Sequence, residues 1–374
     1  MKKTLVIILL LLGILLFDQK QETKEEELRG VYISYIEISK YLKGKEEETS
    51  KNNINQMIEN IKSMNLNTII LQVRPSTDAI YHSKIFPLSK YLTDTNEYPY
   101  DVLSYFTQIC HENNIKLYAW INPYRISTTG TIQDIKENSP AYSYIGSDVL
   151  YENNGVYWNP ARKETNEIIL KGIEEVLEYD VDGILFDDYF YPGEDVDKLE
   201  YISSKKTKEE FRLSIINEMV KEVHNLCKSK NVLFGISPEG NIENNYQKNY
   251  ADIFTWLKEE DYIDFIMPQL YYGFFNSTKP FVTTSNEWNN YIQNNIPLYP
   301  VLAMYKVGKE DFYAKEGKNE WIENNNIIAK EIIHIRNLSH YKGFVLYRYD
   351  NLFLEEDFTN NSQIEIQNLK NLVK

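Results

Sequence analysis

The sequence is short of cysteine and histidine, and these absences exclude several kinds of chemistry. Only Cys110 and Cys227 occur among 374 residues, each inside a helical pattern, so a disulfide framework is not indicated. The five histidines form no His-x-His or His-x-x-x-His pair, which disfavours a metal-dependent deacetylase or amidase. Gly-x-Gly-x-x-Gly, Walker-type and Gly-x-Ser-x-Gly motifs are missing as well. The sequence therefore predicts no cofactor and no bound metal.

Positive charge is also scarce. The chain has 40 Lys and Arg against 55 Asp and Glu, which gives a formal net charge of -15 at pH 7. Such a chain repels a phosphate backbone, and no stripe of basic residues interleaved with aromatics overrides the repulsion. A nucleic-acid partner is therefore not expected.

One apolar run near the N-terminus, residues 5–17, has the charge order of an export signal, with Lys2 and Lys3 before it and an acidic stretch after it. It is shorter than the roughly 20 residues of a comfortable membrane span. No small-x-small cleavage motif follows Gly13. We interpret residues 1–24 as a signal peptide or a signal anchor. The rest of the chain is expected to be extracytoplasmic, either secreted or tethered to the cell membrane by residues 5–17.

The remaining chain alternates short apolar runs with longer segments of helical periodicity, which is typical of repeated βα units. Its composition, 43% hydrophobic and 25% charged, is that of a globular protein. Eight strands are predicted, the number that closes a barrel. The sequence thus predicts an α/β protein with a (β/α)₈ TIM barrel in a single domain, residues 25–374. The predicted strands are 28–35, 68–73, 116–121, 183–187, 232–237, 265–269, 298–303 and 343–347.

Catalytic groups of such barrels lie at the C-terminal ends of the strands. Here these positions are polar and aromatic, and the long stretch 126–158 after the third strand is expected to be an irregular loop that walls a substrate cleft. The chain also has 30 Tyr, whose flat apolar rings with a hydroxyl at the rim suit sugar rings. An AT-biased coding sequence explains the excess of tyrosine equally well.

The fourth predicted strand ends in two adjacent carboxylates, Asp187 and Asp188. Because strand side chains alternate between faces, Asp187 shares a face with Gly183 and Leu185, and we expect it to point into the barrel mouth. Glycoside hydrolysis needs two carboxyl groups, and Glu239, after the neighbouring strand, is a candidate for the second. The catalytic candidates are therefore Asp187, Asp188 and Glu239. Ion-paired or helix-capping roles for the aspartates, and a solvated loop acid for Glu239, are the alternatives.

Other polar and aromatic residues at the strand ends are candidates for binding the substrate. Arginine and amide side chains can hydrogen-bond sugar hydroxyls or an acidic substituent, or can instead orient the catalytic acids. Tyrosine and tryptophan rings are candidate stacking platforms, although a core role is favoured for Trp120, and Trp158 is open to the same reading. The predicted substrate-binding residues are Arg74, Asn122, Tyr124, Arg125, Tyr189, Tyr191, Gln269, Tyr271 and Tyr272.

Six short motifs together resemble the family 10-like glycoside hydrolases, a group of exported bacterial (β/α)₈ proteins. In order they are ELRGV (27–31), QVRP (72–75), AWINPYR (119–125), DGILFDDYFYP (182–192), GISP (235–238) and MPQLY (267–271). The resemblance implies an exported glycosidase acting on a bacterial cell-wall (peptidoglycan-type) or related polysaccharide, with catalysis at Asp187 and Asp188. The family often has an aromatic residue at the position of Glu239, and many members carry a lipoprotein cysteine that this chain lacks.

A looser likeness to chitinase-type barrels, whose fourth strand bears acids in an Asp-Gly-x-x-x-Asp context, implies a third mechanism. On a sugar with an N-acetyl group, the acetamide can act as the nucleophile, so that one protein acid suffices and the other carboxylate orients it. The alternative from another class is a non-catalytic glycan-binding barrel that organises the cell wall. In both cases the expected partner is a glycan.

Overall fold

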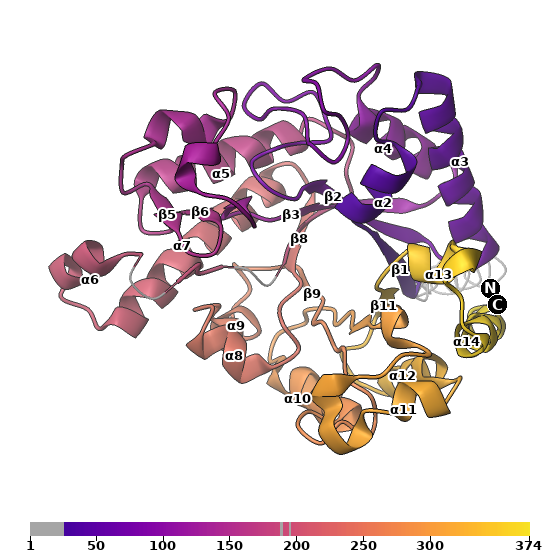
Figure 1. Cartoon of the computed structure of the whole chain (residues 1–374). Coiled ribbons are helices and arrows are strands. Elements are labelled where there is room, and N and C mark those ends of the chain that lie inside the picture. The colour runs from indigo at the N-terminus through magenta and orange to yellow at the C-terminus, as the bar shows by residue number, and fades with distance from the viewer. Residues whose placement is uncertain (1–25, 188–189, 194–195) are drawn as a thin grey trace, which may run out of the picture.

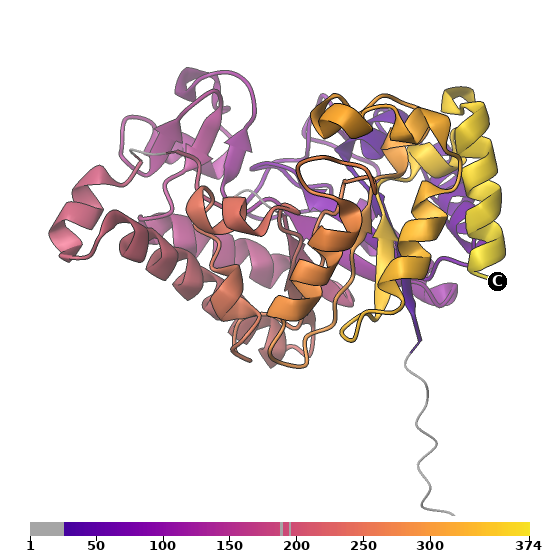
Figure 2. The same cartoon turned by 90° about the horizontal axis from the view of Figure 1, so that it is seen from below.

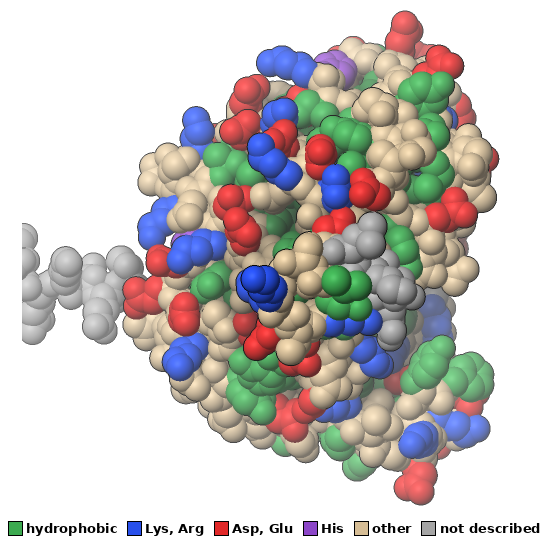
Figure 3. Space-filling model, turned by 90° about the vertical axis from the view of Figure 1, so that its left-hand side faces the viewer, with side chains coloured by type: hydrophobic (Ala, Val, Ile, Leu, Met, Phe, Trp, Pro, Cys, Tyr) green, Lys and Arg blue, Asp and Glu red, His purple; other side chains and the backbone are tan. Residues whose placement is uncertain are grey.

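The computed structural model describes residues 26–187, 190–193 and 196–374. The predicted signal segment, residues 1–24, lies outside this part of the chain. Within the described residues, no helix is both long enough and apolar enough to cross a membrane. On the face drawn in Figure 3, acidic and basic side chains of the described residues are interspersed with apolar ones.

The centre of the molecule is a curled sheet of eight strands in the order β10-β11-β1-β2-β3-β7-β8-β9, with every neighbouring pair parallel. The segments at its two edges also meet, because Tyr299 N donates to Ile266 O at 2.9 Å and Leu270 N donates to Val301 O at 2.9 Å. The eight predicted parallel strands are thereby confirmed. They are β1 (Leu28–Ile33), β2 (Thr68–Arg74), β3 (Lys116–Ile121), β7 (Gly183–Phe186), β8 (Leu233–Ile236), β9 (Phe265–Ile266), β10 (Val301–Leu302) and β11 (Gly343–Leu346).

Two of these strands are much shorter than predicted. Strand β9 ends before Pro268, and β10 begins only after Pro297 and Pro300. Proline has no N–H to donate to the ladder, so these positions cannot sustain regular pairing. The longer strands were predicted from the apolar pattern alone, without accounting for the prolines within it.

Alternate residues of each strand face the two sides of the sheet. On β3, Tyr118 and Trp120 join the cluster inside the curled sheet, together with Leu185 of β7 and Ile70 of β2. Ala119, between them, belongs to the larger core on the other side, where the helices pack. The inside of the sheet is therefore filled by side chains of the described residues.

Helices cover the outer face of the sheet (Figures 1 and 2), with α4 against β3 and α7 against β8. The helical periodicity of the sequence predicts, among others, helices over residues 250–257 and 320–338, and the structure corrects both. The predicted helix 250–257 is reduced to α9 (Ile253–Trp256), because Tyr250 has a positive φ and Asp252 caps the helix by accepting a hydrogen bond from Thr255 N. The predicted helix 320–338 is divided into α11 and α12. The helices are α2 (Tyr35–Tyr41), α3 (Glu47–Ser63), α4 (Val102–Glu112), α5 (Lys163–Val176), α6 (Lys198–Ser204), α7 (Lys208–Ser229), α8 (Ile242–Gln247), α9, α10 (Phe281–Tyr291), α11 (Glu320–Glu323), α12 (Ile327–Ile335), α13 (Asp350–Phe353) and α14 (Asn360–Leu372).

The segment 126–158 is more regular than predicted. It contributes to a small antiparallel sheet of β4 (Arg125–Ser127), β6 (Val156–Trp158) and β5 (Leu150–Glu152), in that order. Each strand is three residues long, too short for a periodic pattern to reveal. This sheet begins four residues after β3 ends, so it stands at the C-terminal end of the main sheet.

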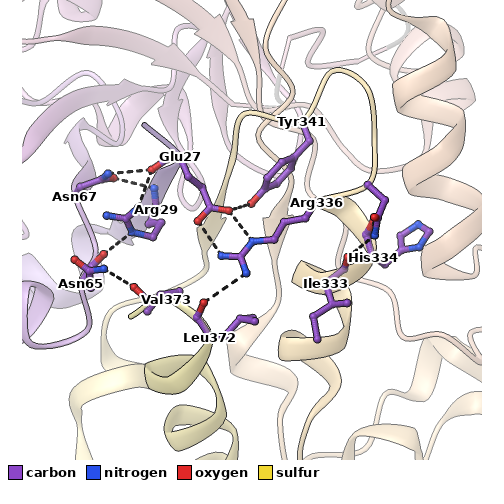
Figure 4. Close-up of polar contacts among 11 residues, drawn as sticks. Glu27, Arg29, Asn65, Asn67, Ile333, His334, Arg336, Tyr341, Leu372 and Val373 are labelled. Carbon is purple, nitrogen blue, oxygen red and sulfur yellow. Dashed lines mark hydrogen bonds and ion pairs between the residues drawn. The ribbon is translucent and has the colours of Figure 1, made fainter. Parts of the chain in front are cut away.

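The opposite end of the sheet is fixed by a polar cluster around Glu27, just before β1 (Figure 4). Arg336 donates to both carboxylate oxygens of Glu27 at 2.8 Å, and the Tyr341 hydroxyl donates to Oε1 at 2.5 Å. Burial acts to raise the pKa of Glu27, but the hydrogen bonds from Arg336 and Tyr341 outweigh it and the pKa is lowered. The cluster ties the first described strand to the segment between α12 and β11.

Candidate active site

A cavity of about 280 Å³ lies at the C-terminal ends of the strands, where the barrel architecture places active sites. Residues at or just beyond the ends of all eight strands contribute to its wall. Aromatic and amide side chains dominate this wall, and Asp187 is its carboxylate among the described residues. The lining residues are Tyr32, Tyr35, Gln72, Trp120, Arg125, Asp187, Ser237, Gln269, Tyr271, Tyr305 and Tyr347.

Asp187 follows the last residue of β7 and is 5% exposed. It lies in the cavity wall, as strand parity from Leu185 predicts. Asn122 Nδ2 donates a short hydrogen bond to Asp187 Oδ2, and Arg125 Nη2 lies 3.9 Å from the same oxygen. An amide donor and a guanidinium both stabilise the ionised form of a carboxylate.

Asn122 is itself oriented by a chain of hydrogen bonds. The backbone N–H of Tyr35 donates to Gln72 Oε1 at 3.0 Å, and Gln72 Nε2 donates to Asn122 Oδ1 at 2.7 Å. A backbone N–H can only donate, so it fixes the orientation of the Gln72 amide, which in turn fixes that of Asn122. The amide nitrogen of Asn122 must then face Asp187. The chain of four residues thus dictates that Asp187 accepts a hydrogen bond.

Six aromatic rings of the described residues line the cavity in front of Asp187, and five of them contact one another. Tyr32 contacts Trp120 and Tyr347 edge-on, with ring centroids 5.3 and 5.4 Å apart, and Tyr271 contacts Tyr305 and Tyr347 at 5.6 and 5.7 Å. Burial raises the pKa of Tyr347 to about 12, and the negative charge of Asp187 contributes to the rise. The Tyr347 hydroxyl therefore keeps its proton at neutral pH. The wall offers apolar ring faces with hydroxyl donors, the combination that suits a sugar.

A second cavity of about 250 Å³ adjoins the first through Arg125, which lines both. Tyr124 and Tyr191 form part of its wall, with Tyr157 and Asn153 from the small antiparallel sheet. This contribution agrees with the expectation that the segment 126–158 walls a cleft. The predicted residues Tyr124, Arg125 and Tyr191 are thus brought together here. Arg125, Gln269 and Tyr271 line the first cavity, and Asn122 lies behind its wall as a hydrogen-bond partner of Asp187.

The loop that carries Tyr191 is held by a buried ion pair. Arg212 donates to both carboxylate oxygens of Asp197, and neither side chain is exposed to solvent. The Tyr191 hydroxyl donates to Asp197 Oδ2 at 2.5 Å, and the Arg212 guanidinium lies 4.7 Å from the centre of the Tyr191 ring. Breaking the Arg212–Asp197 pair would leave an uncompensated buried charge, so Asp197 is held in place. The hydrogen bond to Asp197 in turn holds the Tyr191 side chain.

Arg74 does not lie in either cavity, although we predicted that it binds substrate. A bulge between Gln72 and Arg74 shifts the register against β3, so that Gln72 pairs with Trp120 but Arg74 pairs with Ile121. Arg74 therefore leaves the inner face. It is 2% exposed, and its guanidinium lies 4.2 Å from the centre of the Phe86 ring. The Arg74 side chain therefore lines neither cavity, and no contact among the described residues supports its predicted role in binding substrate.

Glu239 and Tyr272 lie beside the first cavity but do not line it. Asn244 Nδ2 donates to Glu239 Oε1 at 2.8 Å, and Glu239 is close enough to Tyr272 to contribute to the raised pKa of that hydroxyl, which burial mainly causes. Trp158 is in the core, edge-on to Tyr144. Asp188 and Tyr189 lie outside the described residues, so their predicted roles stay predictions.

Several cavity residues were not predicted as binding residues. Strand parity contained the signal for Tyr32 and Tyr347, which share the inner face with Leu28 and Val345. Gln72 and Ser237 stand at strand ends that the sequence marked as polar. Tyr35 and Tyr305 come from short helices beyond the strands, where no period was available to place them.

No group of three or more His, Cys, Asp or Glu side chains is placed to hold a metal ion within the described part of the chain. The wall of the first cavity itself presents a carboxylate, two amides, an arginine and tyrosine hydroxyls.

The fold and this site define a glycosidase-type barrel protein. Comparison with known proteins agrees: the chain belongs to the glycosyl hydrolase-like 10 family, whose model matches residues 27–320. The resemblance inferred from the six motifs is thereby confirmed.

Among the relatives, glycosyl hydrolase YngK of Bacillus subtilis is 31% identical over 316 residues, covering 76% of this chain and 62% of its own length. The match thus spans less than two thirds of that relative. Glycosyl hydrolase DigH of Escherichia coli K12 is 28% identical over 332 residues, covering 79% of this chain and 74% of its own.

Two solved structures show the same fold at 12% sequence identity. The glycoside hydrolase domain of PgaB (BpsB) from Bordetella bronchiseptica has a TM-score of 0.58, covering 91% of this chain and 98% of its own. The endo-1,4-beta-mannanase of Rhizomucor miehei has a TM-score of 0.55, covering 95% and 96%. The curled parallel sheet with its helices is therefore that of TIM-barrel glycosidases.

Proposed function

We propose that this protein is an exported glycoside hydrolase that cleaves glycosidic bonds in a bacterial cell-wall polysaccharide of the peptidoglycan type. The observation that carries the proposal is Asp187, held by Asn122 and Arg125 in a cavity walled by tyrosine rings. Family membership and the glycosidase fold support the reaction class.

In this proposal Asp187 acts as an ionised carboxylate facing the sugar. Glycoside cleavage develops positive charge at the anomeric carbon, and a carboxylate there stabilises it or attacks it. The Asn122 amide and Arg125 keep Asp187 in that form and in place. On an N-acetylated sugar the same carboxylate would orient the acetamide, which then acts as the nucleophile.

The proton for the leaving oxygen comes from a second acid, for which Asp188 and Glu239 are the candidates. Glu239 follows β8, the strand next to β7, and lies outside the cavity lining. Sugar release from purified, peptide-free glycan strands by Asp187→Asn, Asp188→Asn and Glu239→Gln proteins separates the roles. We expect Asp187→Asn and one of the other two to lose activity. Undiminished activity of both Asp187→Asn and Asp188→Asn would refute the assignment.

A non-catalytic glycan-binding barrel is the second candidate, and the position of Glu239 outside the cavity favours it. Sedimentation with insoluble peptidoglycan without new reducing ends after long incubation would establish binding without hydrolysis. New reducing ends that depend on Asp187 would exclude it.

We also propose that residues 1–24 direct export and that residues 25–374 form the single barrel domain. The support is the charge order around residues 5–17. Cell fractionation of the full chain and of a chain lacking residues 1–24 tests this. Retention of the shortened chain in the cytoplasm is the expected result, and export of both chains would contradict it.

A further inference from the structure

A pocket of about 270 Å³ is distinct from the two cavities described above and is lined by the loops that follow β2 and β3. We call it the hydroxyl-rich pocket. Residues from the segments 76–96 and 126–139 line it. Both loops stand on the C-terminal side of the sheet, the same side as Asp187. Eight Ser and Thr side chains line it, next to the apolar side chains of Leu88, Ile126 and Ile135.

A buried carboxylate in this pocket lacks half of its hydrogen bonds. Asp78 is 9% exposed; its Oδ2 accepts from Ser89 Oγ at 2.8 Å and from Lys90 N at 3.3 Å. Its Oδ1 is buried and has no hydrogen-bond partner among the described residues. Burial of a carboxylate oxygen without a partner is costly, so a hydrogen-bond donor supplied by a ligand would stabilise this arrangement.

The other charges of the pocket are largely balanced. Asp134 is bound by the N–H and hydroxyl of Thr131, and Asp94 forms an ion pair with Lys43 at 2.6 Å. Burial raises the pKa of Asp78, and the charges of Lys90 and Lys136 lessen this rise. A site with hydroxyls, one unpartnered carboxylate oxygen, lysines and apolar patches matches a neutral ligand with many hydroxyl groups and an apolar ring face.

The pocket neighbours the cavity that holds Asp187, although the two share no lining residue among those described. Tyr35 of that cavity packs against Tyr91, with ring centroids 4.3 Å apart, and Tyr91 lies within electrostatic reach of both Asp78 and Arg125. Arg125 lines the cavity, and the next residues of the chain, Ile126 and Ser127, line the pocket. A glycan chain leaving the cavity past Tyr35 and Arg125 would reach the pocket.

We propose that the hydroxyl-rich pocket is an accessory glycan site that binds a sugar unit of the same strand, distant from the bond being cleaved. Asp78 accepts hydrogen bonds from its hydroxyls, and Leu88 and Ile126 contact its ring face. This inference rests on the proposed function. Binding of a sugar unit in the pocket makes the enzyme prefer long strands over short oligosaccharides.

Two variants close or disable the pocket in different ways. Asp78→Ala removes the carboxylate and also the hydrogen bonds that it accepts from Ser89 and Lys90. Thr129→Trp fills the pocket from an exposed rim position and disturbs no buried contact. Thr128→Trp is the matched control, because Thr128 is also exposed, adjoins Thr129 and does not line the pocket.

The experiment measures kcat and KM of the full chain on long glycan strands, both peptide-free and peptide-bearing, and on a short oligosaccharide of the same linkage. Losing one or two hydrogen bonds to a carboxylate corresponds to roughly tenfold weaker binding or more. We expect Asp78→Ala and Thr129→Trp to raise KM for long strands by about that factor, with kcat and the values for the short substrate unchanged. The control should behave as the wild type.

Binding of both substrates is measured in parallel by calorimetry. If the wild type binds long strands through the pocket without cleaving them, the proposed function fails and this inference stands. If hydrolysis proceeds but Thr129→Trp leaves KM for long strands unchanged, this inference fails and the function stands. A loss confined to peptide-bearing strands would overturn the sugar assignment in favour of a peptide ligand.

Discussion

Asn122 Nδ2 donates a hydrogen bond to Asp187 Oδ2, and the backbone N–H of Tyr35 sets the direction of this bond through Gln72. The first group of this chain, the Tyr35 N–H, can only donate a hydrogen bond. The last group, the Asp187 carboxylate, can only accept one when it is ionised. The site therefore fixes the position of the carboxylate on which the proposed chemistry depends, and it presents a donor to that carboxylate.

Removing the Asn122 donor should weaken catalysis. A hydrogen bond to a charged group is worth about 1.5–3 kcal/mol, so Asn122→Ala should lower kcat by about 10- to 100-fold, with a smaller change in KM. Gln72→Leu, which breaks the chain one step earlier, should give a smaller loss of kcat. Steady-state kinetics on glycan strands measures both, with thermal unfolding as the control for folding. Equal activity of Asn122→Ala and wild type would show that the bond has no catalytic role.

The ring of Tyr271 should contribute to sugar binding through its face. Tyr271→Ala should raise KM by a few-fold to about tenfold, since aromatic contacts are worth about 0.5–1.5 kcal/mol beyond burial. Tyr271→Phe keeps the ring and should stay near the wild-type value. If both variants raise KM equally, the hydroxyl and not the ring face makes the contact.

Glu331 should destabilise the protein at neutral pH. Both of its carboxylate oxygens are buried without a partner among the described residues, and burial, together with Glu365, raises its pKa well above 4.5. The unfolded chain loses this proton at lower pH than the folded one, so stability falls as pH rises above about 4.5. Glu331→Gln should raise the free energy of unfolding at pH 7 by about 1–3 kcal/mol.

Chemical denaturation at pH 7 and pH 4.5 measures this effect, with Glu323→Gln as the control, because Glu323 is an exposed glutamate on α11. The gain from Glu331→Gln should shrink at the lower pH, where the carboxyl is protonated. A loss of stability at pH 7 would contradict the account of Glu331.

Glu27 should show the opposite dependence. Its pKa is lowered in the folded protein, so its contribution is present above the unfolded pKa of about 4.5 and is lost as pH falls. Glu27→Gln should cost about 1 kcal/mol at pH 7, as expected for weakened charge-assisted bonds to Arg336. Glu26→Gln is the control, because the Glu26 side chain is 73% exposed and its ion pair with Arg29 is worth little. A Glu27→Gln protein as stable as the control would contradict this role of the cluster.

The sequence allowed much of the fold to be predicted, because apolar alternation and strand number depend on a local period. The same parity placed Asp187 in the cavity and would have placed Tyr32 and Tyr347 there as well. Strand parity failed for Arg74. A bulge after Gln72 changes the face to which Arg74 points, and the residues of QVRP give no signal for this bulge.

The loops were harder to predict for a different reason. Tyr35, Tyr305 and the small sheet around Tyr157 reach the cavities through tertiary packing of segments with no periodic pattern. Glu239 follows β8 as expected, but Asn244 of α8 binds its carboxylate beside the cavity. Such side-chain partners depend on the three-dimensional arrangement and not on position along a strand.

The release of reducing ends from purified peptide-free glycan strands by wild-type and Asp187→Asn proteins tests the central claim most directly. Asp187→Asn keeps the shape of the side chain, so the variant should unfold at the wild-type temperature and still bind the strands. Its rate of release should fall by at least about 100-fold, the smaller end of the contribution of a catalytic carboxyl group. A folded Asp187→Asn protein that releases reducing ends at the wild-type rate would contradict the claim.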